Sequence, residues 1–169
     1  LYCGLAGRSS GMGPAPSLGA DMHLRIAQAA ISVPTYPREL LQLAWHTDGE
    51  DAPIPPLSPA AREAVSHVKR AVAMYRAACV AEKKPDSLDL YTLWYHQCGC
   101  LILEHEFTAA RAELERLAKA LRPQGSPSPS MLALNTDVLG TLQWISGMFH
   151  DTQASQRYEK WRQNARMQL

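Results

Sequence analysis

The side chains best suited to chemistry are grouped in one stretch of the chain. His96 and Cys100 are four residues apart, so they share one face of a helix, and His105 follows a turn beyond. Neutral imidazole and thiolate are good zinc ligands, but a structural zinc site needs four ligands and no second pair appears at a suitable spacing. A small helical enzyme or metal-binding protein using His96, Cys100 and His105 is thus an alternative, while the expectation is no metal, no cofactor and no catalytic residue.

Other catalytic arrangements find little support in the sequence. Cys98 and Cys100 lie within helix-like apolar sequence, whereas reactive cysteines favour loops and helix N-termini, where the thiol pKa is lowered. His105 is flanked by two glutamates, but no HExxH motif is present. The pair His150-Asp151 is typical of a helix end followed by an N-cap. The sequence contains neither GxGxxG nor GxxxxGK followed by Ser or Thr, so nucleotide binding by a standard glycine loop is not expected.

The last helix expected from the sequence carries a basic surface with an aromatic residue inside it. Basic residues interleaved with an aromatic can grip phosphates. The whole chain has a formal net charge of only +1, however, so no broad basic field favours nucleic acid as a partner. A solvated basic helix end is the more common meaning of this pattern. The surface consists of Arg157, Lys160, Trp161, Arg162 and Arg166.

Composition places the chain among ordinary globular proteins. Of its 169 residues, 46% are apolar and 20% are charged, which suits one domain with its own core. The four cysteines form no CxxC motif and are too sparse for a disulfide scaffold, which predicts an intracellular protein of the cytoplasm or nucleus. The longest central apolar run, Cys100 to Leu103, is far too short to span a bilayer, so no membrane partner is expected.

Glycine and proline divide the chain into segments. Residues 1–19 hold five of the ten glycines, which predicts a flexible tail that could lie across the body of the protein. Residues 20–169 are expected to form a single helical domain. Two internal linkers, 48–59 and 123–130, are rich in proline and polar residues.

Apolar residues at spacings of three and four predict the helices. In the first helix, Met22, Ile26, Ala29 and Val33 share one face, and Pro34 ends the helix. A short helix follows from Pro37. Ser58-Pro59 is a helix start, and further helices are expected over about 86–102, 107–121, 131–149 and 151–165. Their apolar faces comprise Val65, Val68, Val72, Tyr75 and Cys79; Tyr91, Trp94, Cys98, Leu101 and Ile102; Phe107, Ala110, Leu114, Leu117 and Leu121; Leu134, Val138, Leu142 and Ile145; and Ala154, Tyr158, Trp161 and Ala165.

The segment from Tyr91 to Pro123 resembles a tetratricopeptide repeat. Trp94, Cys98 and Leu101 match the large, small and large positions of the first helix in that family. Phe107, Ala110, Leu114 and Leu117 match the second helix, and Pro123 lies near the proline that ends the repeat. With the helix pattern, the resemblance implies an all-α fold of antiparallel helical hairpins, either a short tetratricopeptide-like right-handed superhelix or a related helical bundle.

The resemblance also implies a function. Such arrays act as non-catalytic scaffolds or adaptors that bind a peptide or helix of another protein in a groove lined by the first helix of each pair. On this chain the corresponding surface would comprise Asp89, Thr92, Tyr95, His96 and Gly99. The other hypothesis is a helical regulatory domain of a larger, transcription-factor-like protein, although no zinc-cluster cysteine motif accompanies it.

Overall fold

The computed structural model describes residues 18–40, 54–122 and 125–169 of the chain. Within these ranges every regular element is a helix, as the sequence predicts, and residues 38–40 begin a further helix. The helices with both ends described are α1 (Ala20–Ile31), α3 (Pro59–Ala81), α4 (Leu88–Leu103), α5 (Phe107–Ala120), α6 (Pro129–Met148) and α7 (Thr152–Arg166).

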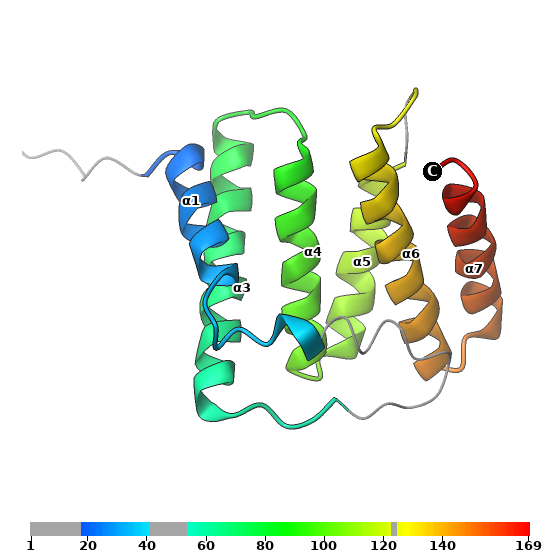
Figure 1. The fold of residues 1–169 in the computed structure, drawn as a ribbon, viewed down its shortest axis with the longest axis horizontal. Coiled ribbons are helices and arrows are strands. Elements are labelled where there is room, and N and C mark those ends of the chain that lie inside the picture. Colours follow the sequence, from blue (N-terminus) through cyan, green and yellow to red (C-terminus); the bar gives the residue numbers. More distant parts are fainter. Residues whose placement is uncertain (1–17, 41–53, 123–124) are drawn as a thin grey trace, which may run out of the picture.

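These helices stand side by side in chain order as three antiparallel pairs, α1 with α3, α4 with α5, and α6 with α7 (Figure 1). Each helix also packs against the next one along the chain, and the first helices of the pairs, α1, α4 and α6, contact one another in turn. From α3 onward the connections are short, and short connections favour this neighbour packing because the chain has no length to cross the structure.

Serine hydroxyls start three of the helices. The side chains of Ser58, Ser87 and Ser128 accept hydrogen bonds from backbone N–H groups three residues later, at 3.1 to 3.3 Å. Proline follows Ser58 and Ser128 directly, where its missing N–H is not needed. The linker predicted to reach residue 130 therefore ends two residues earlier, because Ser128-Pro129 is a helix start of the same kind as Ser58-Pro59.

Three helices end on a residue other than glycine with a positive φ. Lys83, His105 and His150 follow α3, α4 and α6 with φ values of 52°, 62° and 55°. In each case the next N–H bonds back to a carbonyl five residues earlier, as in Lys84 to Cys79 at 2.9 Å. This Schellman arrangement satisfies the last carbonyls of the helix, and it turns the chain sharply into the next element.

The core has two parts that meet at α4. Tyr91, Cys98 and Ile102 of α4 belong to a cluster with α5, α6 and α7. Leu93 and Cys100 on the same helix belong to a cluster with α1 and α3. As a result, α4 is covered on both sides and is the central helix of the molecule.

Most of the apolar faces predicted from spacing are confirmed. The described helices α3, α5 and α6 bury every residue of the predicted faces except Phe107, which is half-buried. On α4 the predicted face is buried or half-buried throughout, and on α7 Trp161 is the exception, with 37% of its surface exposed.

The predicted face of α1 is wrong. Its buried residues are Ala20, His23, Ala27 and Ala30, whereas Met22, Ile26 and Val33 are 46%, 36% and 41% exposed. Small alanines let α1 approach α3 closely, and this close packing outweighs the larger apolar surface on the opposite face. The carboxylate of Glu82, just beyond α3, accepts a hydrogen bond from the N–H of Ala20 and holds the start of α1 in place.

Several predictions fall wholly or partly on residues outside the described ranges. The tail at 1–19 is described only at residues 18 and 19, and the linker at 48–59 only from residue 54.

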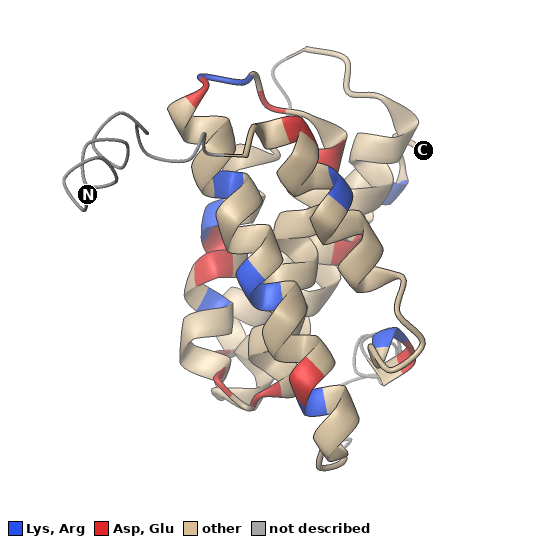
Figure 2. Cartoon of the chain, turned by 90° about the vertical axis from the view of Figure 1, so that its left-hand side faces the viewer, with Lys and Arg blue, Asp and Glu red and all other residues tan. Residues whose placement is uncertain are grey.

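The end of the molecule formed by α1 and α3 carries both acidic and basic residues (Figure 2). Among the described helices, none combines the length and the apolar character needed to cross a membrane.

Candidate binding groove

A cavity of about 600 Å³ lies between α5 and α7, with α6 as its floor. We call it the α5–α7 groove. Apolar, aromatic, amide and charged side chains all contribute to its walls, which is the mixed lining that recognition sites commonly have. The lining residues are Glu115, Ala118, Lys119, Arg122, Leu132, Asn135, Leu139, Arg157, Tyr158, Trp161, Asn164, Ala165 and Gln168.

Trp161 forms the aromatic wall of this groove. Its ring packs edge-on against Tyr158, with 5.7 Å between the ring centroids. Two guanidinium groups lie near the indole, Arg122 at 5.4 Å and Arg157 at 5.7 Å from the ring. A cation near an aromatic ring is attracted to the ring face, and this attraction holds both guanidinium groups beside the indole at the groove wall.

The groove carries an excess of positive charge. Lys119, Arg122 and Arg157 are exposed, and none of them forms an ion pair with a carboxylate of the described chain. The acidic residue in the lining, Glu115, already pairs with Arg111 at 3.3 Å and accepts a hydrogen bond from Tyr158 Oη at 3.4 Å. Within the part of the chain that the structure describes, these three cations therefore have no carboxylate at ion-pair distance.

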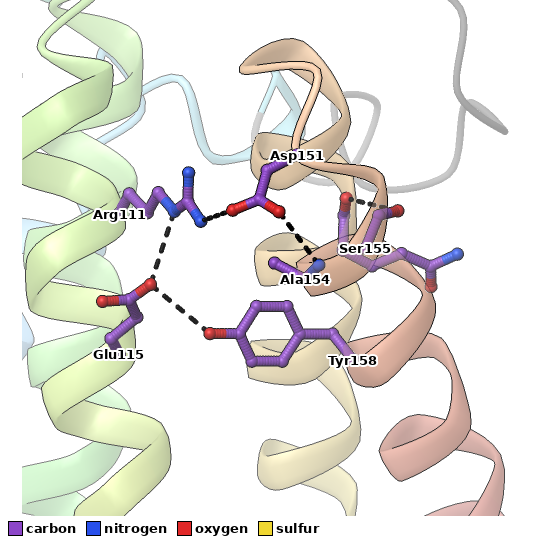
Figure 3. A network of polar contacts seen from close by, with 7 residues as sticks. Arg111, Glu115, Asp151, Ala154, Ser155 and Tyr158 are labelled. Atoms are coloured by element: carbon purple, nitrogen blue, oxygen red, sulfur yellow. Dashed lines mark hydrogen bonds and ion pairs between the residues drawn. The ribbon is translucent and has the colours of Figure 1, made fainter.

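A polar network at one end of the groove fixes the position of α5 relative to α7 (Figure 3). Arg111 of α5 reaches Asp151 at 2.6 Å, and Asp151 caps α7 by accepting from the N–H of Ala154 at 3.1 Å. The Arg111 hydrogen bond, with the Ala154 N–H second, lowers the pKa of Asp151. Arg111 also pairs with Glu115, so ion pairs connect α5, which forms one wall of the groove, to the start of α7, which forms the other.

The groove continues into a second cavity of about 350 Å³. The two cavities share Arg122, Leu132 and Asn135 in their walls. The second one ends near Asp86, whose carboxylate accepts a hydrogen bond from Tyr91 Oη at 2.7 Å. An occupant could therefore extend from the α7 side past Arg122 toward the start of α4.

The basic surface predicted on the last helix is divided by the structure. Arg157 and Trp161 line the groove, whereas Lys160 and Arg166 are exposed outside its lining. Arg162 is not a surface residue as predicted, because it is half-buried against α6. A Cβ added at Gly140 would lie 3.0 Å from the Arg162 guanidinium carbon, so this glycine makes room for the arginine.

The groove surface expected on α4 is not an exposed patch. Asp89 is exposed and Thr92 is half-buried, but Tyr95 and Gly99 are buried. Tyr95 Oη lies 2.8 Å from Thr141 Oγ1 of α6. The expectation of exposure is wrong at these two positions, because α4 is covered by its neighbours on both sides.

The possible metal cluster is not assembled. His96 Nδ1 and Cys100 Sγ lie 3.0 Å and 3.9 Å from the hydroxyl of buried Tyr36. Burial lowers the pKa of His96 to about 4 and raises that of Cys100 to about 12, so both side chains are neutral at physiological pH. His105 is exposed in the turn after α4, and the described residues contain no group of three His, Cys, Asp or Glu side chains able to hold a metal.

Sequence reasoning missed the α5 side of the groove. Lys119 and Arg122 are separated from Arg157 by the whole of α6, and no local spacing connects them. A usable signal was present, since Arg122 is the second of two basic residues at the end of a helix, just before the linker.

Comparison of the chain with protein-family models, with curated proteins and with solved structures found no match in any of the three.

Proposed function

We propose that this chain is a non-catalytic protein-binding module that holds a segment of a partner protein in the α5–α7 groove. The observation that carries the proposal is Trp161, a large aromatic side chain that is 37% exposed in a cavity wall between two arginines. Tryptophan, tyrosine and arginine are the residue types that contribute most to protein interfaces, above all when they cluster in one pocket.

The remaining lining supports binding of a peptide segment. Asn135, Asn164 and Gln168 offer side-chain amides, which can donate to and accept from a peptide backbone. Leu132 and Leu139 supply an apolar floor. The carboxylate of the lining, Glu115, is already engaged by Arg111 and Tyr158, which suits a structural role for this acid.

The succession of helix pairs also supports a scaffold role, with the tetratricopeptide-like character as part of the proposal. Neighbouring pairs pack in chain order, as in helical-repeat arrays. The proposed binding face differs from the one that the resemblance implies, because the groove lies between the second helices α5 and α7. We place the module inside the cell, since Cys79, Cys98 and Cys100 are all free and buried.

Affinity capture with a matched control tests this function. Wild-type protein, Trp161→Ala and Met167→Ala are immobilised and exposed to extract of the native cells, and the captured partner is then purified and titrated by calorimetry. Met167 is 79% exposed and follows the same helix outside the groove, so its removal should leave affinity unchanged. Trp161→Ala should weaken binding by at least about tenfold, equal to roughly 1.4 kcal/mol.

Two results would count against the function. A partner bound equally by all three proteins would show that the groove is not the binding site. Absence of any partner across all three would remove the support for a protein-binding module.

A further inference from the structure

We infer that the segment bound in the α5–α7 groove is acidic and carries at least one apolar residue between its carboxylates. This inference rests on the proposed function and adds the chemistry of the partner. It follows from the charge of the groove, from an equivalent site elsewhere in the same molecule, and from the apolar and amide residues of the lining.

The groove presents three cations with which no carboxylate of the described residues pairs. Lys119 and Arg122 at the end of α5 face Arg157 on α7 across the cavity that they line. The carboxylate of Glu115 is engaged by Arg111 and Tyr158, so it does not neutralise these three cations. Arginine binds carboxylates through two parallel hydrogen bonds, which makes an acidic side chain the complementary group.

A similar arrangement of arginine and tryptophan occurs between α3 and α5. Arg76 of α3 lies 3.9 Å above the ring of Trp94 on α4 and pairs with Glu113 of α5 at 3.4 Å. Glu113 also accepts from Trp94 Nε1 at 2.9 Å. Here an arginine on a tryptophan is completed by a carboxylate from the neighbouring helix. In the α5–α7 groove, arginines lie near Trp161 with no such carboxylate in the described chain, so the partner would supply it.

The charge and lining of the groove favour an acidic peptide over a nucleic acid. The chain as a whole has a net charge of +1, so there is no wide basic field to follow a phosphate backbone. The groove instead combines few cations with an apolar floor and three amides, which suits side chains and backbone of a peptide.

Fluorescence anisotropy with defined peptide pools tests the inference. Three fluorescein-labelled pools of about ten residues, extending over roughly 30 Å, share Leu or Phe at two fixed positions. The other positions are Glu or Asp in the acidic pool, Gln or Asn in the amide pool, and Lys or Arg in the basic pool. The acidic pool should bind at least about tenfold tighter than the amide pool, and added salt should reduce the difference.

Charge reversal supplies the matched variants. Arg122→Glu with Arg157→Glu should lower affinity for the acidic pool at least about tenfold and raise affinity for the basic pool. Lys160→Glu with Arg166→Glu makes the same change of charge on α7 but outside the groove lining, so it should retain the wild-type preference.

Each contrary outcome identifies what has failed. Equal binding of the acidic and amide pools would overturn the acidic specificity while leaving a peptide-binding groove in place. Failure of every pool, with a natural partner still dependent on Trp161, would overturn the specificity alone. Tighter binding of a single-stranded poly-uridine RNA than of the acidic pool, lost on reversing Arg122 and Arg157, would overturn both this inference and the proposed function.

Discussion

Two gaps between neighbouring helix pairs contain the same kinds of residue and differ in one respect. Between α3 and α5, Arg76 lies on Trp94 and both are bonded to Glu113. Between α5 and α7, Arg122 and Arg157 lie near Trp161, and no carboxylate of the described chain pairs with either arginine. We call these the closed gap and the open gap.

The difference between the gaps separates structural residues from residues available for binding. In the closed gap, the indole of Trp94 and the guanidinium of Arg76 are both bonded to Glu113, and these contacts connect α3, α4 and α5. In the open gap, the same groups remain at the edge of a 600 Å³ cavity. Composition alone would treat both as a tryptophan with basic neighbours, so the distinguishing feature is the presence of Glu113.

The largest expected loss of stability comes from a substitution in the closed gap. Trp94→Ala should lower the free energy of unfolding by about 3 kcal/mol, because it removes a packed side chain and a donor to Glu113. Trp161→Ala should lower it by only about 1 kcal/mol, since that side chain already faces the cavity. Urea unfolding of both variants measures the contrast. Equal losses would show that the two tryptophans have the same structural role.

The next prediction concerns pH and the opposite side of α4. Burial lowers the pKa of His96 to about 4, below its ordinary value of 6.5, so the unfolded chain binds more protons between these values. The stabilising contribution of neutral His96 is complete above pH 6.5 and is lost as pH falls to 4, by about 3 kcal/mol in all. His96→Gln should flatten this part of the stability profile. Exposed His105→Gln is the control, and an unchanged profile in His96→Gln would contradict the prediction.

Removal of the distinguishing carboxylate should make the closed gap resemble the open one. Glu113→Gln weakens the pairing with Arg76 and with Arg116, and we expect a loss of about 1 to 2 kcal/mol in unfolding free energy. High salt should reduce the difference between wild type and variant. A variant as stable as wild type would mean that Glu113 does not hold the gap together.

The helix ends offer a smaller effect that is independent of both gaps. His105→Gly and His150→Gly relieve a positive φ, and each should raise the free energy of unfolding by about 1 kcal/mol. Ala112→Gly at an exposed position of α5 is the matched control and should lower it by about 1 kcal/mol. Thermal unfolding compares them, and a loss of stability in either turn variant would contradict the Schellman assignment.

The smallest change in stability comes from adding an acid to the open gap. Asn135 lines both cavities next to Arg122, and Asn135→Asp has nearly the same shape. We expect a gain of about 0.5 kcal/mol, with weaker binding of the acidic peptide pool because the groove then has its own carboxylate. Unchanged peptide affinity would show that Arg122 is not part of the binding surface.

The fold was largely predictable because most helices follow local rules. The spacing of Val65, Val68 and Val72 predicts the buried face of α3, and Ser58-Pro59 predicts its start. The face of α1 was not predictable from apolar spacing, because its alanines are buried by close approach to α3, a tertiary effect. The exposure assigned to Tyr95 overlooked a local signal, since α4 is apolar on nearly all sides, which is typical of a central helix.

The candidate site was predictable only in part. The interleaving of Arg157 and Trp161 on one helix is visible in the sequence, and the structure places both in the groove wall. Lys119 and Arg122 join them only because α5 and α7 flank α6 in space. The pairing of Glu115 with Arg111 follows the i, i+4 spacing of a helix and was open to prediction, whereas the pairing of Arg111 with Asp151 joins segments 40 residues apart and was not.

Site-specific photo-crosslinking is the most direct test of the central claim that the open gap is a protein-binding groove. A benzophenone side chain is placed at Asn164, which lines the groove, or at Lys160, which lies outside it on the same helix. After irradiation in the native cells, mass spectrometry identifies any crosslinked segment. The account predicts an acidic segment of one protein crosslinked at position 164 and not at 160. The same crosslinks from both positions, or crosslinks from 160 alone, would contradict it.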